Sequence, residues 1–134
     1  MATEFQLRVV TPRRQVVDQP VTEVTAPGTL GEFGVLPDHA NLLSSLDPGR
    51  LTYVDRAGTH VLAIGEGFAE VSNNVMTVLA EAAETPSEIN SAAARAELAE
   101  AEAELANLVP IDPDYTAADN KRRWAQARLD AAAK

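Results

Sequence analysis

The amino-acid sequence predicts an α+β protein, in which an N-terminal antiparallel β-sandwich over residues 1–86 precedes a C-terminal antiparallel two-helix hairpin over residues 87–134. Three observations carry this prediction. Apolar and polar residues alternate at period two as far as about residue 84, and Gly, Pro and Asn turns separate these short runs. Beyond that point the apolar period lengthens to three or four, which is typical of helices.

The strands are expected in short segments of the first 84 residues. In "FQLRVV", Phe5, Leu7 and Val9 alternate with polar residues, which is the pattern of a half-buried strand. The runs "VTEVTA", "LTYV", "HVLAI", "FAEVS" and "VMTVLA" follow, with turn signals such as Pro27-Gly28 between them. Many short strands without helical periods between them favour a sandwich or barrel.

The helices are expected after a capping signal. "TPSE" offers Thr85 as N-cap, Pro86 at the first helical position and Glu88 reaching back to the cap. Two prolines in "VPIDPDY" end this helix, and Thr116 is the expected cap of the second. The predicted apolar stripes are Ala94, Leu98, Ala101, Leu105 and Leu108, then Ala118, Ala125, Leu129 and Ala132. Because Ala buries few methylene groups, we expect a weakly held hairpin that can open or leave its docking site.

Composition and charge exclude several classes of protein. The net charge of -9 argues against nucleic-acid binding, which needs clustered Lys and Arg. The absence of Cys removes disulfides, thiolate zinc sites and Cys nucleophiles. No leader pattern is recognised. The sequence contains no run of ~18 apolar residues, so direct membrane insertion is not expected. Residues 117–134 form the one basic segment, with five bases against two acids.

Catalytic and metal chemistry are poorly supported. Ser44 or Ser45 with His39 and Asp38 would make a hydrolase site, but the G-x-S-x-G elbow is missing. Neither His has a second ligand at metal-binding spacing, so hydrogen-bonded structural roles are favoured. "GEGF" lacks the spacing of a phosphate loop and predicts a bulge or a close strand approach. Trp124, among basic residues, is interpreted as a packing anchor rather than a nucleic-acid stacking platform.

A long segment between residues 26 and 51 supports an assignment to a family. "APGTLGEFGVLPDHANLLSSLDPGRL" closely resembles the hallmark segment of the epsilon subunit of F-type ATP synthases, called delta in mitochondria. "LRVVTP", "GFAEV", "MTVLAE" and the Ala/Glu-rich end extend the resemblance over almost the whole chain. Three positions depart from the family pattern, with Asp38 for a frequent Gly, Asn41 for Pro and Glu66 for the first of two Gly.

The resemblance implies a central-stalk subunit that couples rotation of the ring of c subunits to ATP synthesis and is not an enzyme by itself. The gamma subunit and the c ring are the implied partners of the sandwich. Docking there is expected from Gly31, Glu32, Gly34 and His39. The alternative for Glu32 is that its carboxylate only holds its own loop through backbone N–H groups.

The resemblance also implies that the hairpin restrains ATP hydrolysis by reaching the alpha and beta subunits. Lys121, Arg122, Arg123 and Arg128 are the expected contacts with an acidic region of beta. In the alternative interpretation, these basic residues neutralise the acidic first helix in a folded-down hairpin.

Members of the family that bind ATP resemble I/L-D-x-x-R/K-A at the start of the first helix. This chain has "INSAAA", in which Asn90 replaces the Asp and Ala93 the basic residue, while Arg95 is two positions out of register. No cofactor is therefore expected. Two alternatives stay open: an ATP-sensing module whose hairpin clasps nucleotide, and a sandwich adaptor unrelated to the synthase.

The expected location is the cytoplasmic face of a bacterial plasma membrane, ahead of the stromal face of a thylakoid.

Overall fold

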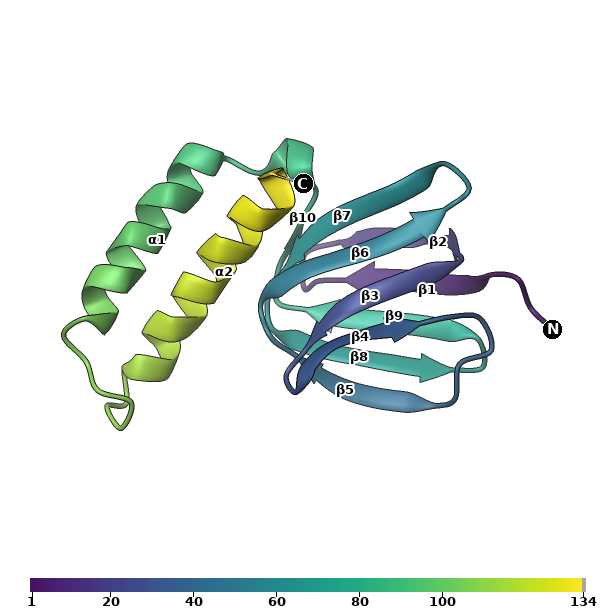
Figure 1. Ribbon diagram of the computed structural model, residues 1–134, viewed down its shortest axis with the longest axis horizontal. Helices are drawn as coiled ribbons and strands as arrows, with labels where there is room; N and C mark the ends of the chain where they lie inside the picture. Colours follow the sequence, from purple (N-terminus) through teal and green to yellow (C-terminus); the bar gives the residue numbers. More distant parts are fainter. Residues whose placement is uncertain (134) are drawn as a thin grey trace.

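The computed structural model describes residues 1–133 as ten strands, one 3-10 turn and two α-helices (Figure 1). The strands are β1 (Phe5–Val10), β2 (Gln15–Val21), β3 (Glu23–Gly28), β4 (Gly31–Val35), β5 (Leu42–Leu46), β6 (Gly49–Asp55), β7 (Gly58–Ile64), β8 (Gly67–Ser72), β9 (Val75–Ala80) and β10 (Ala83–Glu84). The turn η1 (Pro86–Glu88) and the helices α1 (Ser91–Leu105) and α2 (Tyr115–Ala133) follow. Neither helix has the length and apolar character needed to cross a membrane within the described residues.

All ten strands belong to one sheet that curls into two facing layers (Figure 1). The strand order is β10-β7-β6-β3-β5-β8-β9-β1-β2, and β4 pairs with β3 outside this path. The predicted α+β class with an N-terminal sandwich and two C-terminal helices is confirmed. One pair differs from the expected antiparallel arrangement, because β1 and β9 run parallel. Alternation at period two is the same in either direction, so it cannot reveal strand polarity.

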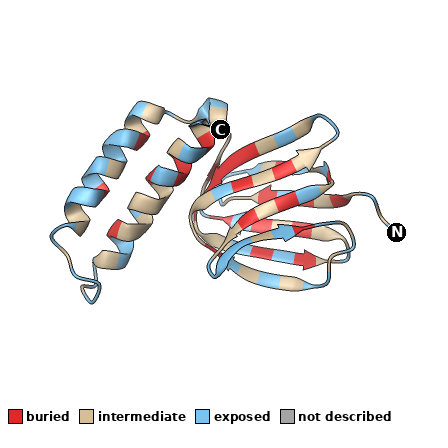
Figure 2. Cartoon of the chain, viewed as in Figure 1, coloured by how far each residue is buried: buried red, intermediate tan, exposed pale blue. Residues whose placement is uncertain are grey.

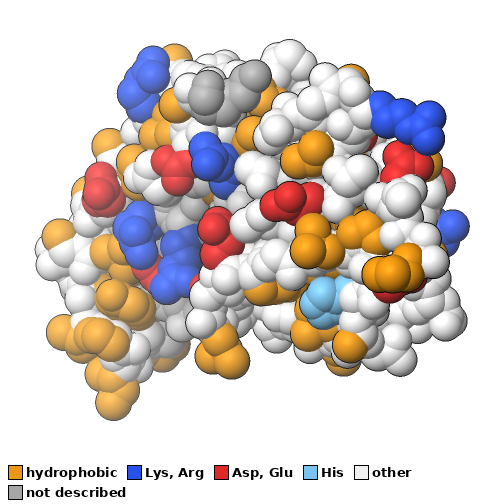
Figure 3. Space-filling view, turned by 45° about the vertical axis from the view of Figure 1, so that its right-hand side comes forward, with side chains coloured by type: hydrophobic (Ala, Val, Ile, Leu, Met, Phe, Trp, Pro, Cys, Tyr) orange, Lys and Arg blue, Asp and Glu red, His pale blue; other side chains and the backbone are white. Residues whose placement is uncertain are grey.

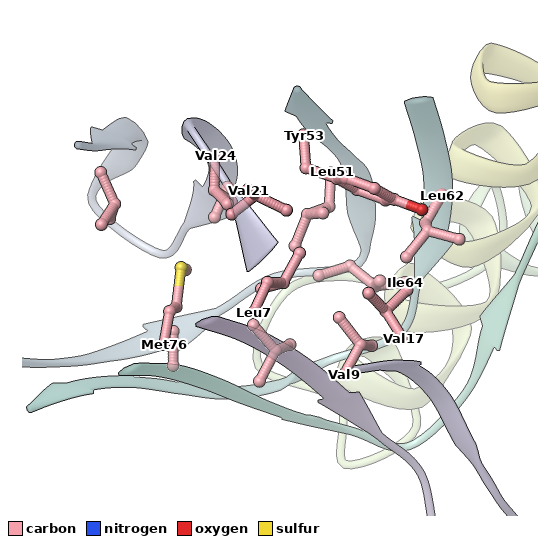
Figure 4. Close-up of a cluster of buried hydrophobic side chains, with 14 of the residues drawn as sticks. Leu7, Val9, Val17, Val21, Val24, Leu51, Tyr53, Leu62, Ile64 and Met76 are labelled. Carbon is pink, nitrogen blue, oxygen red and sulfur yellow. The ribbon is translucent and has the colours of Figure 1, made fainter. Parts of the chain in front are cut away.

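The core lies between the two layers and is almost entirely aliphatic. Figure 4 shows side chains from β1, β2 and β9 pointing toward those from β3, β6 and β7. Leu7, Val9 and Met76 from one side and Leu51 and Ile64 from the other are fully buried. Along β1 the inward and outward positions alternate as the sequence predicts, which is also visible as alternating colours in Figure 2.

The hairpin docks through one helix only. α2 packs against β7 and β6, whereas α1 packs on α2 and lies on the outside (Figure 1). Val61 and Ala63 of β7 form a small cluster with Ala127 and Ala131 of α2, and Trp124 packs against it. The interpretation of Trp124 as a packing anchor is confirmed. This cluster contains mostly small side chains, so little apolar surface holds the hairpin to the sandwich.

The apolar stripes of the helices differ in part from those expected. Ala94 and Ala101 are buried on α1, and Ala118 and Ala125 on α2, but Leu98, Leu105, Leu108, Leu129 and Ala132 are only partly buried. The residues of α2 that face the sandwich, Ala127 and Ala131, were not in the expected stripe. At about 100° per residue, Ala127 lies roughly opposite Ala125, so α2 has two buried faces.

Both helices also begin elsewhere than expected. The capping box is present, with the Thr85 N–H donating to Glu88 Oε1 at 2.9 Å, but it caps η1 rather than an α-helix. Ile89 is extended (φ -80°, ψ 125°) and ends that turn, so α1 begins at Ser91 with Asn90 as its N-cap. The second helix begins at Tyr115, so Thr116 lies inside α2 instead of capping it.

Candidate functional site

The glycine turn, residues 28–31 between β3 and β4, forms an exposed edge of the sandwich. Gly28 pairs with Gly31, whose φ is 131°, a conformation that L side chains rarely adopt. A Cβ on Gly28 would lie 2.6 Å from the Gly31 carbonyl oxygen, so this tight turn requires its glycines. The Leu30 side chain at the tip is fully exposed. Glu32 is exposed too, and its carboxylate accepts no hydrogen bond from any group within residues 1–133. The alternative of a loop-holding role for Glu32 therefore has no hydrogen bond to support it.

The loop that follows β4 is tied to the N-terminal segment. Asp38 has φ 62°, and its N–H donates to Asn74 Oδ1 at 2.8 Å. The Asp38 carboxylate accepts a hydrogen bond from the Ala2 N–H at 2.8 Å. His39 is half-buried, with Nδ1 2.6 Å from the carbonyl oxygen of Ala40. A left-handed backbone at Asp38 explains why the family pattern often has Gly at this position.

The expected docking residues lie apart. Glu32 and Gly34 are both exposed on β4, and Glu32 lines a groove that it shares with Arg123 and Asp130 of α2. His39 lies in the loop beyond the other end of β4. Glu32 and His39 therefore do not form one compact patch, and the glycine turn faces the helical hairpin.

Arg128 joins three elements of the structure. The residue is only 9% exposed, although Arg is rarely buried. Nε donates to Glu84 Oε1 of β10 at 2.7 Å, and Nη1 donates to Glu97 Oε2 of α1 at 3.2 Å. The guanidinium carbon also lies 5.8 Å from the centre of the Trp124 ring. This side chain thus links both helices to the last strand of the sandwich.

The other basic residues of α2 are paired as well, as the interleaved charges in Figure 3 illustrate. Arg123 Nη1 lies 2.8 Å from Asp47 Oδ2 of the sandwich, while Arg122 Nη2 lies 2.7 Å from Asp119 Oδ1 on its own helix. Burial opposes ionisation of Asp119, but hydrogen bonds and charge from Arg122 and Arg123 outweigh it, so its pKa is lowered. Lys121 Nζ lies 3.7 Å from Glu104 of α1.

Only part of the neutralisation of α1 predicted for a folded-down hairpin is therefore found. Arg128 and Lys121 reach acids of α1, as that interpretation requires. Arg122 and Arg123 turn instead to acids of α2 and the sandwich.

An exposed apolar face on β5, β8 and β9 was missed by the sequence reasoning. Leu43 is 73% exposed, Phe68 55% and Leu79 53%. Phe68 pairs directly with Leu79, and Val10 pairs with Leu79 on the other side, so the apolar side chains adjoin across the strands. A hollow beside Phe68 and Leu79 has three carboxylates in its lining, Asp47, Glu66 and Glu81. The available signal was the alternation in "FAEVS", which places Phe68 on the same outward side as Glu70.

The remaining candidate residues serve local structure. Asn90 Oδ1 accepts the Ala93 N–H at 3.0 Å as the cap of α1, and Arg95 is exposed without an ion pair among residues 1–133. Ser44 Oγ donates to the Ser45 carbonyl rather than to His39. His60 contacts Asp55 at 2.9 Å.

Neither a catalytic triad nor a metal centre is assembled within the described part of the chain. The residues of "GEGF" form a close approach between strands, since a Cβ on Gly67 would lie 1.9 Å from the Leu79 carbonyl oxygen.

Comparison with known proteins agrees with this architecture. The family described as "ATP synthase, Delta/Epsilon chain, beta-sandwich domain" matches residues 4–86. The chain is 41% identical over 134 residues to the ATP synthase epsilon chains of Citrifermentans bemidjiense and Geobacter sulfurreducens, covering 100% of this chain and 97% of each relative. It is 40% identical over 132 residues to ATP synthase epsilon chain 2 of Syntrophotalea carbinolica, covering 98% of this chain and 96% of that relative.

Solved structures show the same fold. A chain of the Euglena gracilis mitochondrial ATP synthase (OSCP/F1/c-ring) matches with a TM-score of 0.83 at 23% identity, covering 100% of this chain and 84% of that one. A chain of the Tetrahymena thermophila mitochondrial ATP synthase (central stalk/c-ring) matches with a TM-score of 0.64 at 15% identity, covering 95% of both. With full-length relatives at about 40% identity and the family match over the sandwich, the chain belongs to the ATP synthase epsilon chain family.

Proposed function

We propose that this chain is a central-stalk subunit of an F-type ATP synthase, in which the sandwich couples ring rotation to ATP synthesis and the hairpin restrains ATP hydrolysis. In this proposal it is a non-catalytic component of the enzyme complex. Family membership supports the assignment to the complex. The observation that carries the division of labour is the way in which the hairpin docks, through mostly small side chains, Trp124 and ion pairs from α2. Such a contact is compatible with a hairpin that undocks from the sandwich and docks again.

The exposed apolar face of β5, β8 and β9 is our proposed seat for the gamma subunit. Large apolar side chains that adjoin on a surface mark protein contacts, and the gamma subunit is the stalk partner that the family implies. A Phe68→Asp variant is expected to lose co-purification with gamma. Ile111→Asp is the matched control, because Ile111 is 90% exposed but lies in the connection between the helices. Equal recovery of gamma with both variants would overturn this assignment.

The glycine turn is our proposed contact with the c ring. Gly31, Glu32 and Gly34 would dock there, with His39 in a separate contact beyond the other end of β4. A Glu32→Lys variant is expected to uncouple proton flow from ATP synthesis, because it reverses the exposed charge beside the turn. Glu23→Lys is the matched control, because it makes the same charge change at an exposed position of β3, the strand that pairs with β4. A folded Glu32→Lys variant with unimpaired coupling would count against docking.

The basic residues of α2 are our proposed contacts with the alpha and beta subunits when the hairpin is raised. Arg122 offers the cleanest test, because its partner Asp119 travels on the same helix. An Arg122→Ala variant should therefore weaken inhibition of hydrolysis without loosening the hairpin from the sandwich. Arg123 and Arg128 form ion pairs with residues of the sandwich. Their substitution would therefore change both the inhibition of hydrolysis and the docking of the hairpin on the sandwich. Full inhibition by the Arg122→Ala variant would remove Arg122 from the contact.

We further propose that inhibition does not depend on bound nucleotide. Asn90 is uncharged, and its Oδ1 already caps α1. Arg95 forms no ion pair within residues 1–133. These contacts give the ATP-sensing alternative no specific support. A titration of the chain with ATP, monitored through the amide NMR shifts of residues 89–95, should leave those shifts unchanged.

The proposed location is peripheral, at the cytoplasmic face of a bacterial plasma membrane, in keeping with bacterial relatives.

A further inference from the structure

The connection between the sandwich and α1 consists of two parts that differ in how they are held. Ala83 and Glu84 form β10, which pairs with Ile64 and Ala63 of β7. Residues 86–88 form η1, and only Ile89 and Asn90 separate this turn from the first residue of α1.

A side chain from the opposite end of the sequence holds η1. Arg14, in the turn between β1 and β2, extends Nη2 to the Ala83 carbonyl oxygen at 3.2 Å and to Glu88 Oε1 at 2.9 Å. The same Glu88 oxygen accepts the Thr85 N–H at 2.9 Å and the Thr85 hydroxyl at 3.0 Å. One carboxylate therefore closes the turn and ties it to the sandwich.

The next two residues are bound differently. Ile89 and Asn90 are both extended, with φ/ψ of -80°/125° and -88°/98°, between a 3-10 turn and an α-helix. The Asn90 side chain and carbonyl are engaged with the first turn of α1, not with the sandwich. The Ile89 side chain packs against the small cluster in which Val61 and Ala63 of β7 meet Ala127 and Ala131 of α2, so departure of α2 would remove one side of its packing.

We propose that the Arg14–Glu88 clamp keeps η1 with the sandwich, so that the hairpin moves about a pivot at Ile89 and Asn90. This inference deepens the proposed function and rests on it, since it specifies how the inhibitory hairpin is carried. Glu84 then stays on the sandwich when Arg128 leaves it. Without the clamp, residues 85–88 would join the tether and lengthen it by up to about 13 Å at ~3.3 Å per extended residue.

Amide hydrogen exchange on the full chain tests the clamp residue by residue. In the native chain, the Thr85 and Glu88 amides should exchange far more slowly than unstructured amides, because both are hydrogen-bonded within the clamped turn. An Arg14→Ala variant should accelerate both by up to about fivefold, the size expected when an exposed ion pair is removed. The amides of β9 should not change, which shows that the sandwich remains folded.

Arg13→Ala is the matched control. Arg13 lies in the same turn and is exposed, but its side chain makes no hydrogen bond within residues 1–133. Glu88→Gln approaches the clamp from the other side and should also speed exchange at Thr85. If Arg14→Ala and Arg13→Ala give the same exchange at Thr85 and Glu88, the clamp is overturned. Because exchange is measured on the isolated chain, this failure is distinct from a failure of inhibition in the assembled synthase.

Discussion

Arg128 Nε of α2 donates a 2.7 Å hydrogen bond to Glu84, the last residue of the sheet. The same guanidinium reaches Glu97 of α1, so one nearly buried cation joins both helices to the last strand of the sandwich. Around it the apolar contact consists of Val61 and Ala63 against two alanines of α2, with Trp124 and Ile89 packed on this cluster. The docked state of the hairpin therefore combines a small apolar contact with charge pairs.

Replacing Arg128 with Ala should loosen the hairpin more than any other single charge removal. Hydrogen bonds to charged groups contribute about 1.5 to 3 kcal/mol, so we expect roughly 10- to 100-fold faster amide exchange in α2. Arg95→Ala is the control, since it removes an exposed Arg of α1 that has no ion pair among residues 1–133. Unchanged exchange in Arg128→Ala would show that the Arg128 contacts do not hold the helices to the sandwich.

The Asp47–Arg123 pair should contribute less and should depend on salt. Both side chains are more than a third exposed, and exposed pairs contribute about 0.2 to 1 kcal/mol. Asp47→Asn is therefore expected to speed α2 exchange by no more than about fivefold at low ionic strength. At about 1 M salt, where the Debye length is about 3 Å, the difference from the native chain should nearly vanish. An effect that persists at high salt would indicate a role other than charge pairing.

The clamp at η1 should respond to acid. The hydrogen bond from Arg14, aided by those from Thr85, lowers the pKa of Glu88 from 4.5 to about 2. Because the pKa in the folded state lies below the unfolded value, the clamp is fully effective above about pH 4.5 and is lost as the pH falls toward 2. Carboxyl carbon NMR shifts should place the Glu88 midpoint near 2 in the native chain, and higher in Arg14→Ala. An ordinary Glu88 midpoint in the native chain would contradict the contact.

Gly67 should tolerate no larger residue. A Cβ there would lie 1.9 Å from the Leu79 carbonyl oxygen and 2.9 Å from Ala80 Cα, so the paired backbones of β8 and β9 would have to separate. We expect Gly67→Ala to lower the free energy of unfolding by about 1 to 3 kcal/mol. Gly34→Ala, whose Cβ would meet nothing closer than 3.9 Å, serves as the control in urea unfolding. Equal stabilities would mean that the strands adjust without cost.

Period-two alternation and turn signals were sufficient to predict the sandwich, because the inward positions of β1 and β8 follow directly from the sequence. The parallel pairing of β1 with β9 was not predictable in this way, since it joins two strands from opposite ends of the sandwich sequence, such as Leu7 with Met76. The same limitation applies to α2. Its second buried face consists of Ala127 and Ala131, which resemble a neutral helix surface until β7 is placed against them.

The candidate site was predictable only as a set of residue types. The glycine turn followed from its own backbone requirements, as Gly31 with φ 131° confirms. The partners of the basic residues did not follow, because Asp47, Glu84 and Glu97 are brought to α2 by tertiary packing. The Arg14–Glu88 contact spans 74 positions; the capping box predicts only the bond from Glu88 back to Thr85, and no motif marks Arg14 as its partner.

ATP hydrolysis by the reconstituted catalytic head with gamma tests the central claim most directly. The full chain should be compared with a chain that ends after Glu88, which keeps β10 and the clamp but lacks both helices. Circular dichroism and gamma co-purification would first establish that the shortened chain is folded and bound. If the hairpin restrains hydrolysis, the shortened chain should give a severalfold higher rate. Equal rates for the two chains, each bound to gamma, would contradict the account.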